Sequence, residues 1–227
     1  MTGNETQGHP AGTMPKLSNL YLLAYNSLQA VAWAVCLALS LSSFVSTKAV
    51  SGAYASAGDL IYFLQMVQFL EVIHGAIGLV PSGVVFPLMQ WTGRAHFLFV
   101  LRQTHEVQES PSVFITFVAW SLSEVIRYPH YAFNCTGSCP SWITYLRYTA
   151  FIVLYPPGMA GETWLMYQAL PFVKKTSVFP NFFAGLSYYN FLRVLLVCYP
   201  FLCLKLYLHM FKQRRSKLGE HPKKKKR

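Results

Sequence analysis

Long apolar runs separated by short polar segments constrain this chain more than any other feature. A bilayer core of about 30 Å is crossed by roughly 20 apolar residues in a helix. Because the backbone must satisfy its own hydrogen bonds in lipid, each run of that length predicts a helix. Only 12% of the residues are charged, too few to cover a soluble domain of this length. The six predicted spans cover residues 20–45, 60–80, 84–101, 113–131, 143–170 and 182–211.

The spans leave little chain for anything outside the bilayer. Six helices of about 20 residues use about half of the 227 residues. We expect an all-α, polytopic integral membrane protein whose six transmembrane helices form one bundle. The predicted divisions are a disordered cytosolic N-terminus over residues 1–16, the membrane domain over residues 17–211, and a basic cytosolic tail over residues 212–227.

The positive charge is concentrated in that tail. Residues 212–227 contribute +8 of the net charge of +11, so the body is a poor nucleic-acid-binding surface. The positive-inside rule predicts a cytosolic C-terminus, and six spans place the N-terminus on the same side. Lys224 and Lys225, fourth and third from the end, fit the dilysine retrieval signal of the endoplasmic reticulum. The alternatives are a polybasic segment attracted to lipid headgroups and a nuclear-import-like run.

Ionisable residues within the predicted spans point to function. A charge at membrane depth is costly, so such a residue usually faces a partner or a polar cavity. One explanation is a set of interhelical ion pairs, although fewer residues would suffice to fix the packing. The residues are Asp59 at an entrance, then Glu71, His74, Arg94, His96, Glu124, Arg127, Arg147, Glu162 and Arg193.

The span over residues 143–170 carries the sharpest pattern. Tyr155 and Glu162 are seven residues apart, which places them on one face of a helix, about 10 Å apart along its axis. Pro156, Pro157 and nearby glycines lie between them, so we expect a bend that opens a pocket. A phenol and a carboxyl group facing such a pocket form a plausible acid–base pair. Alternatively, the two groups only hydrogen-bond to each other.

Two sequence blocks resemble a known family. The run YLRYTAFIVLYPPGMAGE, which ends at Glu162, is similar to the signature of the very-long-chain 3-hydroxyacyl-CoA dehydratase family, also called protein-tyrosine-phosphatase-like A. The block WSLSEVIRYPHY, over residues 120–131, is similar to a second motif of that family. The resemblance extends from about Asn19 to the lysine tail and looks closest to plant-type members. The doublet Pro156-Pro157 departs from a commoner single proline.

The resemblance implies an activity and a set of site residues. The activity is dehydration of 3-hydroxyacyl-CoA to trans-2-enoyl-CoA in very-long-chain fatty-acid elongation, beside the condensing enzyme and the reductases of that cycle. Tyr155 and Glu162 are implied as the catalytic pair. The implied supporting or substrate-binding residues are Glu71, Gln90, Arg94 and Arg147.

Dehydration needs a base for the Cα proton and an acid for the leaving hydroxyl, and it requires neither a metal nor a redox cofactor. We expect Glu162 to be the base and Tyr155 the acid, with the opposite assignment still open. Arg94 or Arg147 is expected to attract the anionic CoA head. If the helix starts near Ser141 on the cytosolic side, Tyr155 lies about 20 Å deep and Glu162 about 30 Å.

Other function classes fit the sequence less well. A tyrosine phosphatase needs an Arg six residues after its nucleophilic Cys, and none of the five cysteines has one. A di-iron desaturase or hydroxylase needs several clustered histidines, whereas Glu71 and His74 form a single ExxH pattern. A non-catalytic membrane scaffold of the elongase complex remains the alternative.

Overall fold

The computed structural model describes residues 17–175 and 187–218. Within these ranges the chain is helical and contains no strand, which confirms the all-α fold class. The elements are α1 (Leu17–Thr47), α2 (Ala53–Val67), α3 (Phe69–Ala76), α4 (Val85–Gln103), the 3-10 turn η1 (His105–Val107), α5 (Pro111–Cys135), α6 (Ser141–Arg147), α7 (Phe151–Lys175) and α8 (Tyr188–Leu218).

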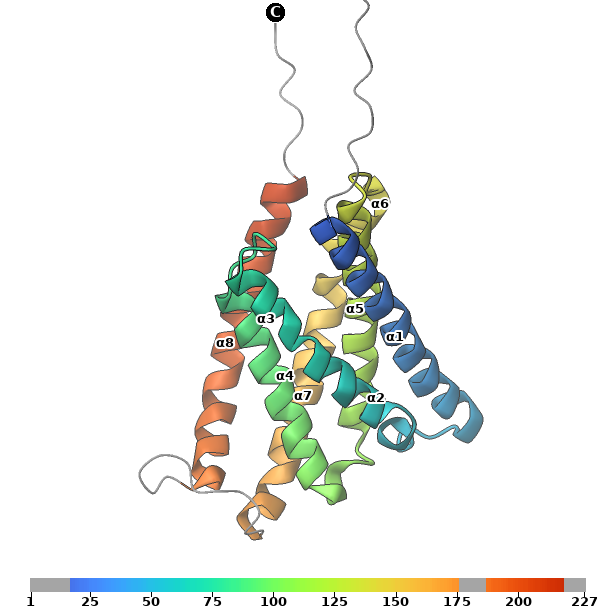
Figure 1. The fold of residues 1–227 in the computed structure, drawn as a ribbon. Helices are drawn as coiled ribbons and strands as arrows, with labels where there is room; N and C mark the ends of the chain where they lie inside the picture. The colour runs from blue at the N-terminus through green and yellow to red at the C-terminus, as the bar shows by residue number, and fades with distance from the viewer. Residues whose placement is uncertain (1–16, 176–186, 219–227) are drawn as a thin grey trace, which may run out of the picture.

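The long helices run up and down in one bundle (Figure 1). The beginning of α1 and the end of α8 lie at the same end of the bundle, where α6 also lies. By length and composition, three segments of the described chain can cross a membrane: Leu17–Thr47, Ala53–Ala76 and Tyr188–Leu218. The other long helices, α4, α5 and α7, carry charged residues of the interior. These features agree with the predicted membrane fold.

The surface and the interior have the polarity expected of a protein in lipid. On α5, Glu124 is fully buried and Arg127 is 8% exposed. On α8, by contrast, the apolar side chains of Val197 and Phe201 are 68% and 72% exposed. Exposing such large apolar side chains to water is unfavourable, whereas contact with lipid tails suits them, and charged residues in membrane helices usually face the interior of the bundle.

Two predicted spans differ from the observed helices. The span over residues 60–80 begins earlier, at Ala53, and is interrupted at Gln68 between α2 and α3. The span over residues 143–170 is two helices, α6 and α7, separated at residues 148–150. The helical boundary therefore lies upstream of the prolines that were expected to cause it. In α8, the helix continues through Pro200.

A hydrogen bond from α8 helps α7 to accommodate a proline. Pro156 and Pro157 fall in the second turn of α7, beyond the first four N–H groups that have no partner within the helix, so each proline leaves one carbonyl group without its usual donor. Pro156 has no N–H for the carbonyl of Ile152, and the hydroxyl of Tyr207 donates to that oxygen instead at 3.2 Å. An interhelical hydrogen bond from α8 thus compensates for the proline.

A glycine allows α7 to approach the central helix α5 closely. A Cβ atom at Gly161 would lie 2.4 Å from Oγ1 of Thr116 and 3.0 Å from the carbonyl oxygen of Ser112. The first distance is too short for a real Cβ and the second is at the tight limit of such contacts, so a larger residue would require α5 or the Thr116 side chain to shift. Small residues commonly allow such close contacts between membrane helices. The next residue, Glu162, is thereby brought against α5.

Candidate active site

Glu162 is held by residues from two other helices. Trp120 of α5 donates its indole N–H to Oε1 of Glu162 at 2.7 Å. Tyr199 of α8 donates its hydroxyl to Oε2. Each carboxylate oxygen therefore has a donor, and an ionised carboxylate with two donors keeps lone pairs free to accept a proton. Glu162 thus has the hydrogen bonding and the remaining acceptor capacity of a general base.

Tyr155 is anchored one turn further along α8. Its hydroxyl donates to the carbonyl oxygen of Cys203 at 2.9 Å. Its ring stacks on Tyr207, with ring centroids 5.2 Å apart and an angle of 14° between the planes. Tyr155 and Glu162 therefore each have a separate partner on α8, and the recorded hydrogen bonds of Tyr155 and Glu162 do not join them to each other.

Both site residues contact one stripe of α8. Tyr199, Cys203 and Tyr207 recur every four residues, which places them on the same helix face. Along this stripe, Tyr199 contacts Glu162, whereas Cys203 and Tyr207 contact Tyr155. The stripe was not part of the predicted site. Its sequence signal is the four-residue spacing of polar and aromatic groups in the last apolar run.

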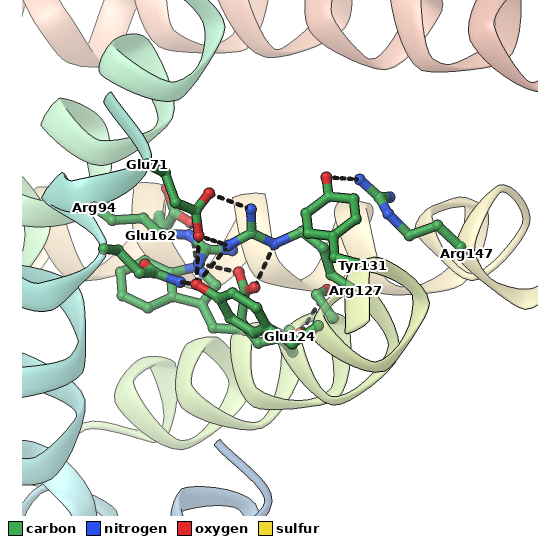
Figure 2. Close-up of polar contacts among 12 residues, drawn as sticks. Glu71, Arg94, Glu124, Arg127, Tyr131, Arg147 and Glu162 are labelled. Atoms are coloured by element: carbon green, nitrogen blue, oxygen red, sulfur yellow. Dashed lines mark hydrogen bonds and ion pairs between the residues drawn. The ribbon is translucent and has the colours of Figure 1, made fainter. Parts of the chain in front are cut away.

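An ion network in the interior, between α3, α4 and α5, lies beside Glu162 (Figure 2). Arg127 contacts both oxygens of Glu71, at 2.6 and 3.0 Å, and donates to Glu124 at 2.6 Å. Arg94 donates to the other oxygen of Glu124 at 2.5 Å. Two acids and two bases give a network with no net charge. For these four residues, the expectation of interhelical ion pairs is confirmed.

An aromatic residue connects the network to Glu162. The guanidinium of Arg94 lies over the ring of Trp120, 4.8 Å from its centroid. The same indole donates its N–H to Glu162. A cation over an indole face restrains the ring by electrostatic attraction. The ion network therefore supports the position of the donor that holds Glu162.

The remaining predicted site residues lie outside this cluster. Gln90 is exposed on α4. Arg147, at the end of α6, donates to the hydroxyl of Tyr131 at 3.3 Å. Arg147 also lines a recess between α5 and the α6–α7 junction, together with Ser123, Ile126, Ala150, Phe151 and Leu154. Lys224 and Lys225 fall outside the described residues.

The other ionisable residues of the predicted spans are placed as follows. His74 pairs with Tyr21 at 2.8 Å, and His96 pairs with Tyr188 at 2.8 Å. Asp59 and Arg193 are exposed. Within the described part of the chain, no group of three or more His, Cys, Asp or Glu side chains is arranged to hold a metal ion. The ExxH residues Glu71 and His74 are engaged instead with Arg127 and Tyr21.

Comparison with known proteins identifies the family. Residues 65–220 match the family described as "Protein tyrosine phosphatase-like protein, PTPLA". The chain is 35% identical over 216 residues to "Very-long-chain (3R)-3-hydroxyacyl-CoA dehydratase 2" of Homo sapiens, covering 91% of this chain and 85% of the relative.

Further relatives carry related names. The chain is 36% identical over 211 residues to "Very-long-chain (3R)-3-hydroxyacyl-CoA dehydratase 1" of Ovis aries, covering 89% of this chain and 72% of the relative. It is 32% identical over 231 residues to dehydratase 3 of Mus musculus, covering 97% and 63%. No solved structure matches the chain. The likeness to plant-type members stays a prediction. The chain belongs to the protein tyrosine phosphatase-like (PTPLA) family, among whose members it is similar to very-long-chain (3R)-3-hydroxyacyl-CoA dehydratases.

Proposed function

We propose that this protein dehydrates very-long-chain 3-hydroxyacyl-CoA to trans-2-enoyl-CoA, the third step of fatty-acid elongation. Relatives named for this activity cover most of the chain. The observation that carries the proposal is the placement of Tyr155 and Glu162 on one side of α7, each oriented by α8. A hydroxyl donor and a carboxylate acceptor in one apolar bundle are the two groups that the elimination needs.

We assign the base to Glu162 and the acid to Tyr155. The Glu162 carboxylate accepts hydrogen bonds from two donors, whereas the Tyr155 hydroxyl acts as a donor. Glu162 takes the Cα proton, and the electron pair of that C–H bond forms the Cα–Cβ double bond. The Cβ–O bond breaks, and the departing hydroxyl takes a proton from Tyr155 and leaves as water. Glu162 then gives its proton to water and Tyr155 takes one from water, which restores the enzyme.

The start of α7 bears on how deeply the thioester must enter. Since α7 begins at Phe151, Tyr155 lies about 6 Å and Glu162 about 16 Å along this helix. These lengths are counted from Phe151, and α6 (Ser141–Arg147) precedes it at the end of the bundle, so Tyr155 is the nearer of the two residues to that end (Figure 1). We propose that the acyl thioester enters from there.

Arg147 is our candidate for the CoA head. Arg94 is already paired with Glu124, with a side chain that is only 13% exposed. Arg147, by contrast, lines the recess at the α6–α7 junction and makes no recorded ion pair with a described carboxylate. A guanidinium offers several donors in a planar fork that suits phosphate oxygens. Phe151 and Leu154 give the same recess apolar walls.

We also propose a setting for the enzyme. Lys224 and Lys225 favour the endoplasmic-reticulum membrane with both termini in the cytosol, and the common end shared by the start of α1 and the end of α8 supports this topology (Figure 1). The condensing enzyme and the reductases of the elongation cycle are the proposed partners, because they make the 3-hydroxyacyl-CoA and consume the enoyl-CoA.

The test is product formation by the purified protein in lipid nanodiscs. A very-long-chain (3R)-3-hydroxyacyl-CoA is supplied, and trans-2-enoyl-CoA is followed by mass spectrometry. The proposal expects turnover without any other elongase protein. A non-catalytic scaffold would give no product alone, although it would still increase flux when added to the other elongase enzymes.

A further inference from the structure

The stripe on α8 suggests that the last helix takes part in the reaction as well as in the packing. Its contacts with α7 include the Glu162 carboxylate and the Tyr155 hydroxyl and ring, beside the carbonyl oxygen of Ile152. Outward-facing residues of the same helix are apolar, as in Val197 and Phe201. The stripe thus turns hydroxyl and carbonyl groups of α8 toward α7, on a different face from Val197 and Phe201.

Tyr199 differs from the other members of the stripe, because its hydroxyl contacts the proposed base directly. The hydroxyl of Tyr199 donates to Oε2 of Glu162, and Trp120 holds Oε1 from the opposite helix. With both donors, the plane of the carboxylate is fixed between α5 and α8. With Trp120 alone, the carboxylate can rotate about its last side-chain bond and change the direction of its free lone pairs.

We propose that Tyr199 is a positioning residue for the dehydration: its hydroxyl orients the Glu162 carboxylate toward the Cα proton of the substrate. This inference rests on the proposed function and extends it to a third helix. Since an ionised carboxylate has about four lone-pair sites, two donors leave about two sites for the proton. Proton transfer depends steeply on geometry, and a displacement of about 1 Å can reduce the rate roughly 100-fold.

Tyr199→Phe is the primary test, because it removes the hydroxyl and keeps the ring. In nanodiscs, kcat should fall by roughly 10-fold to 100-fold while KM stays nearly unchanged. The matched control is Tyr167→Phe, which removes the same group from a side chain of α7 that is 69% exposed. This control should retain the kcat of the unmodified protein.

A second comparison separates positioning from general packing. If Tyr199 acts through Glu162, adding Tyr199→Phe to Glu162→Gln should lower the residual kcat little further, because groups acting as a unit are non-additive. Full multiplication of the two effects would overturn the inference, and so would a normal kcat for Tyr199→Phe. A normal kcat for Glu162→Gln itself would instead refute the assignment of the base in the proposed function.

A third measurement applies even if Tyr199→Phe fails to fold. Incorporating 3-fluorotyrosine in place of Tyr199 keeps the ring and the hydroxyl but makes the phenol a stronger donor. The infrared carboxylate band of Glu162, identified by its loss in Glu162→Gln, should shift in response. An unchanged band would mean that the two groups do not interact in the membrane, and it would overturn the inference.

Discussion

Removing Arg127 should destabilise the protein more than any surface charge does. Arg127 contacts Glu71 through two hydrogen bonds and Glu124 through a third, and it is 8% exposed. Arg127→Met keeps a flexible side chain that can fill most of the same space but removes the charge. The network then holds two carboxylates and only Arg94, so one negative charge is left without a counter-ion in the interior.

The magnitude follows from that unpaired charge. Breaking a buried ion pair by removing one partner costs about 3–5 kcal/mol. For a chain of this size each kcal/mol lowers the melting temperature by about 2–4 °C. Arg127→Met should therefore melt about 6–20 °C below the unmodified protein. The measurement is thermal unfolding of purified protein in one detergent, followed by tryptophan fluorescence.

Two matched variants control for other effects. Arg102→Met changes an exposed arginine at the end of α4, which lies over the ring of Tyr62 at 4.7 Å, and should cost no more than about 1 kcal/mol. The double variant Arg127→Met with Glu71→Gln removes one charge of each sign and should recover part of the lost stability. The reasoning is refuted if Arg127→Met melts like Arg102→Met, or if the double variant is no more stable than Arg127→Met alone.

The remaining predictions concern packing, substrate binding and localisation. Gly161→Ala should cost about 1–3 kcal/mol through overpacking against Thr116 and lower kcat by displacing Glu162. In the control Gly158→Ala, the new Cβ would make ordinary contact with Ala119 at 3.5 Å, so its melting temperature should stay near that of the unmodified protein. Equal melting temperatures for the two variants would contradict the close approach of α7 to α5 at Gly161. Arg147→Lys keeps the charge but loses the planar guanidinium, so it should raise KM for 3-hydroxyacyl-CoA more than it lowers kcat. An unchanged KM would mean that Arg147 does not bind the CoA head. Changing Lys224 and Lys225 to Ser should shift part of the protein to the Golgi in imaged cells, and an unchanged distribution would place retention elsewhere.

The long helices could be predicted where a single apolar run decides the boundaries. The run over residues 20–45 became α1, Leu17–Thr47, with ends within three residues of the prediction. The continuation of α7 through Pro156 and Pro157 was not predicted, because prolines show where a helix loses a hydrogen bond but not which group replaces it. Tyr207 supplies that group from α8. Such a contact depends on how two distant helices pack.

In the site, likewise, the sequence predicts patterns within one helix but not the partners that other helices supply. The seven-residue spacing of Tyr155 and Glu162 is a local pattern, and the family motif repeats it. The partners of these residues are not local, since Tyr199 is 37 residues from Glu162 and Cys203 is 48 residues from Tyr155. Likewise, the cost of buried charge predicts that Arg127 has partners but does not identify them. Its pairing with Glu71 spans 56 residues and requires the packed fold.

The most direct test of the proposed chemistry compares Tyr155→Phe and Glu162→Gln at equal amounts of folded, inserted protein. Tyr155→Phe removes only the hydroxyl, and Glu162→Gln removes only the ionisable carboxylate. The rate of trans-2-enoyl-CoA formation should fall by roughly 10²–10⁴ in each variant, the range typical of acid–base groups. The double variant should lose much less than the product of the two effects. Near-normal dehydration by both single variants would contradict the assignment of these residues and direct the search for the catalytic groups to Glu71, Arg94 and Glu124.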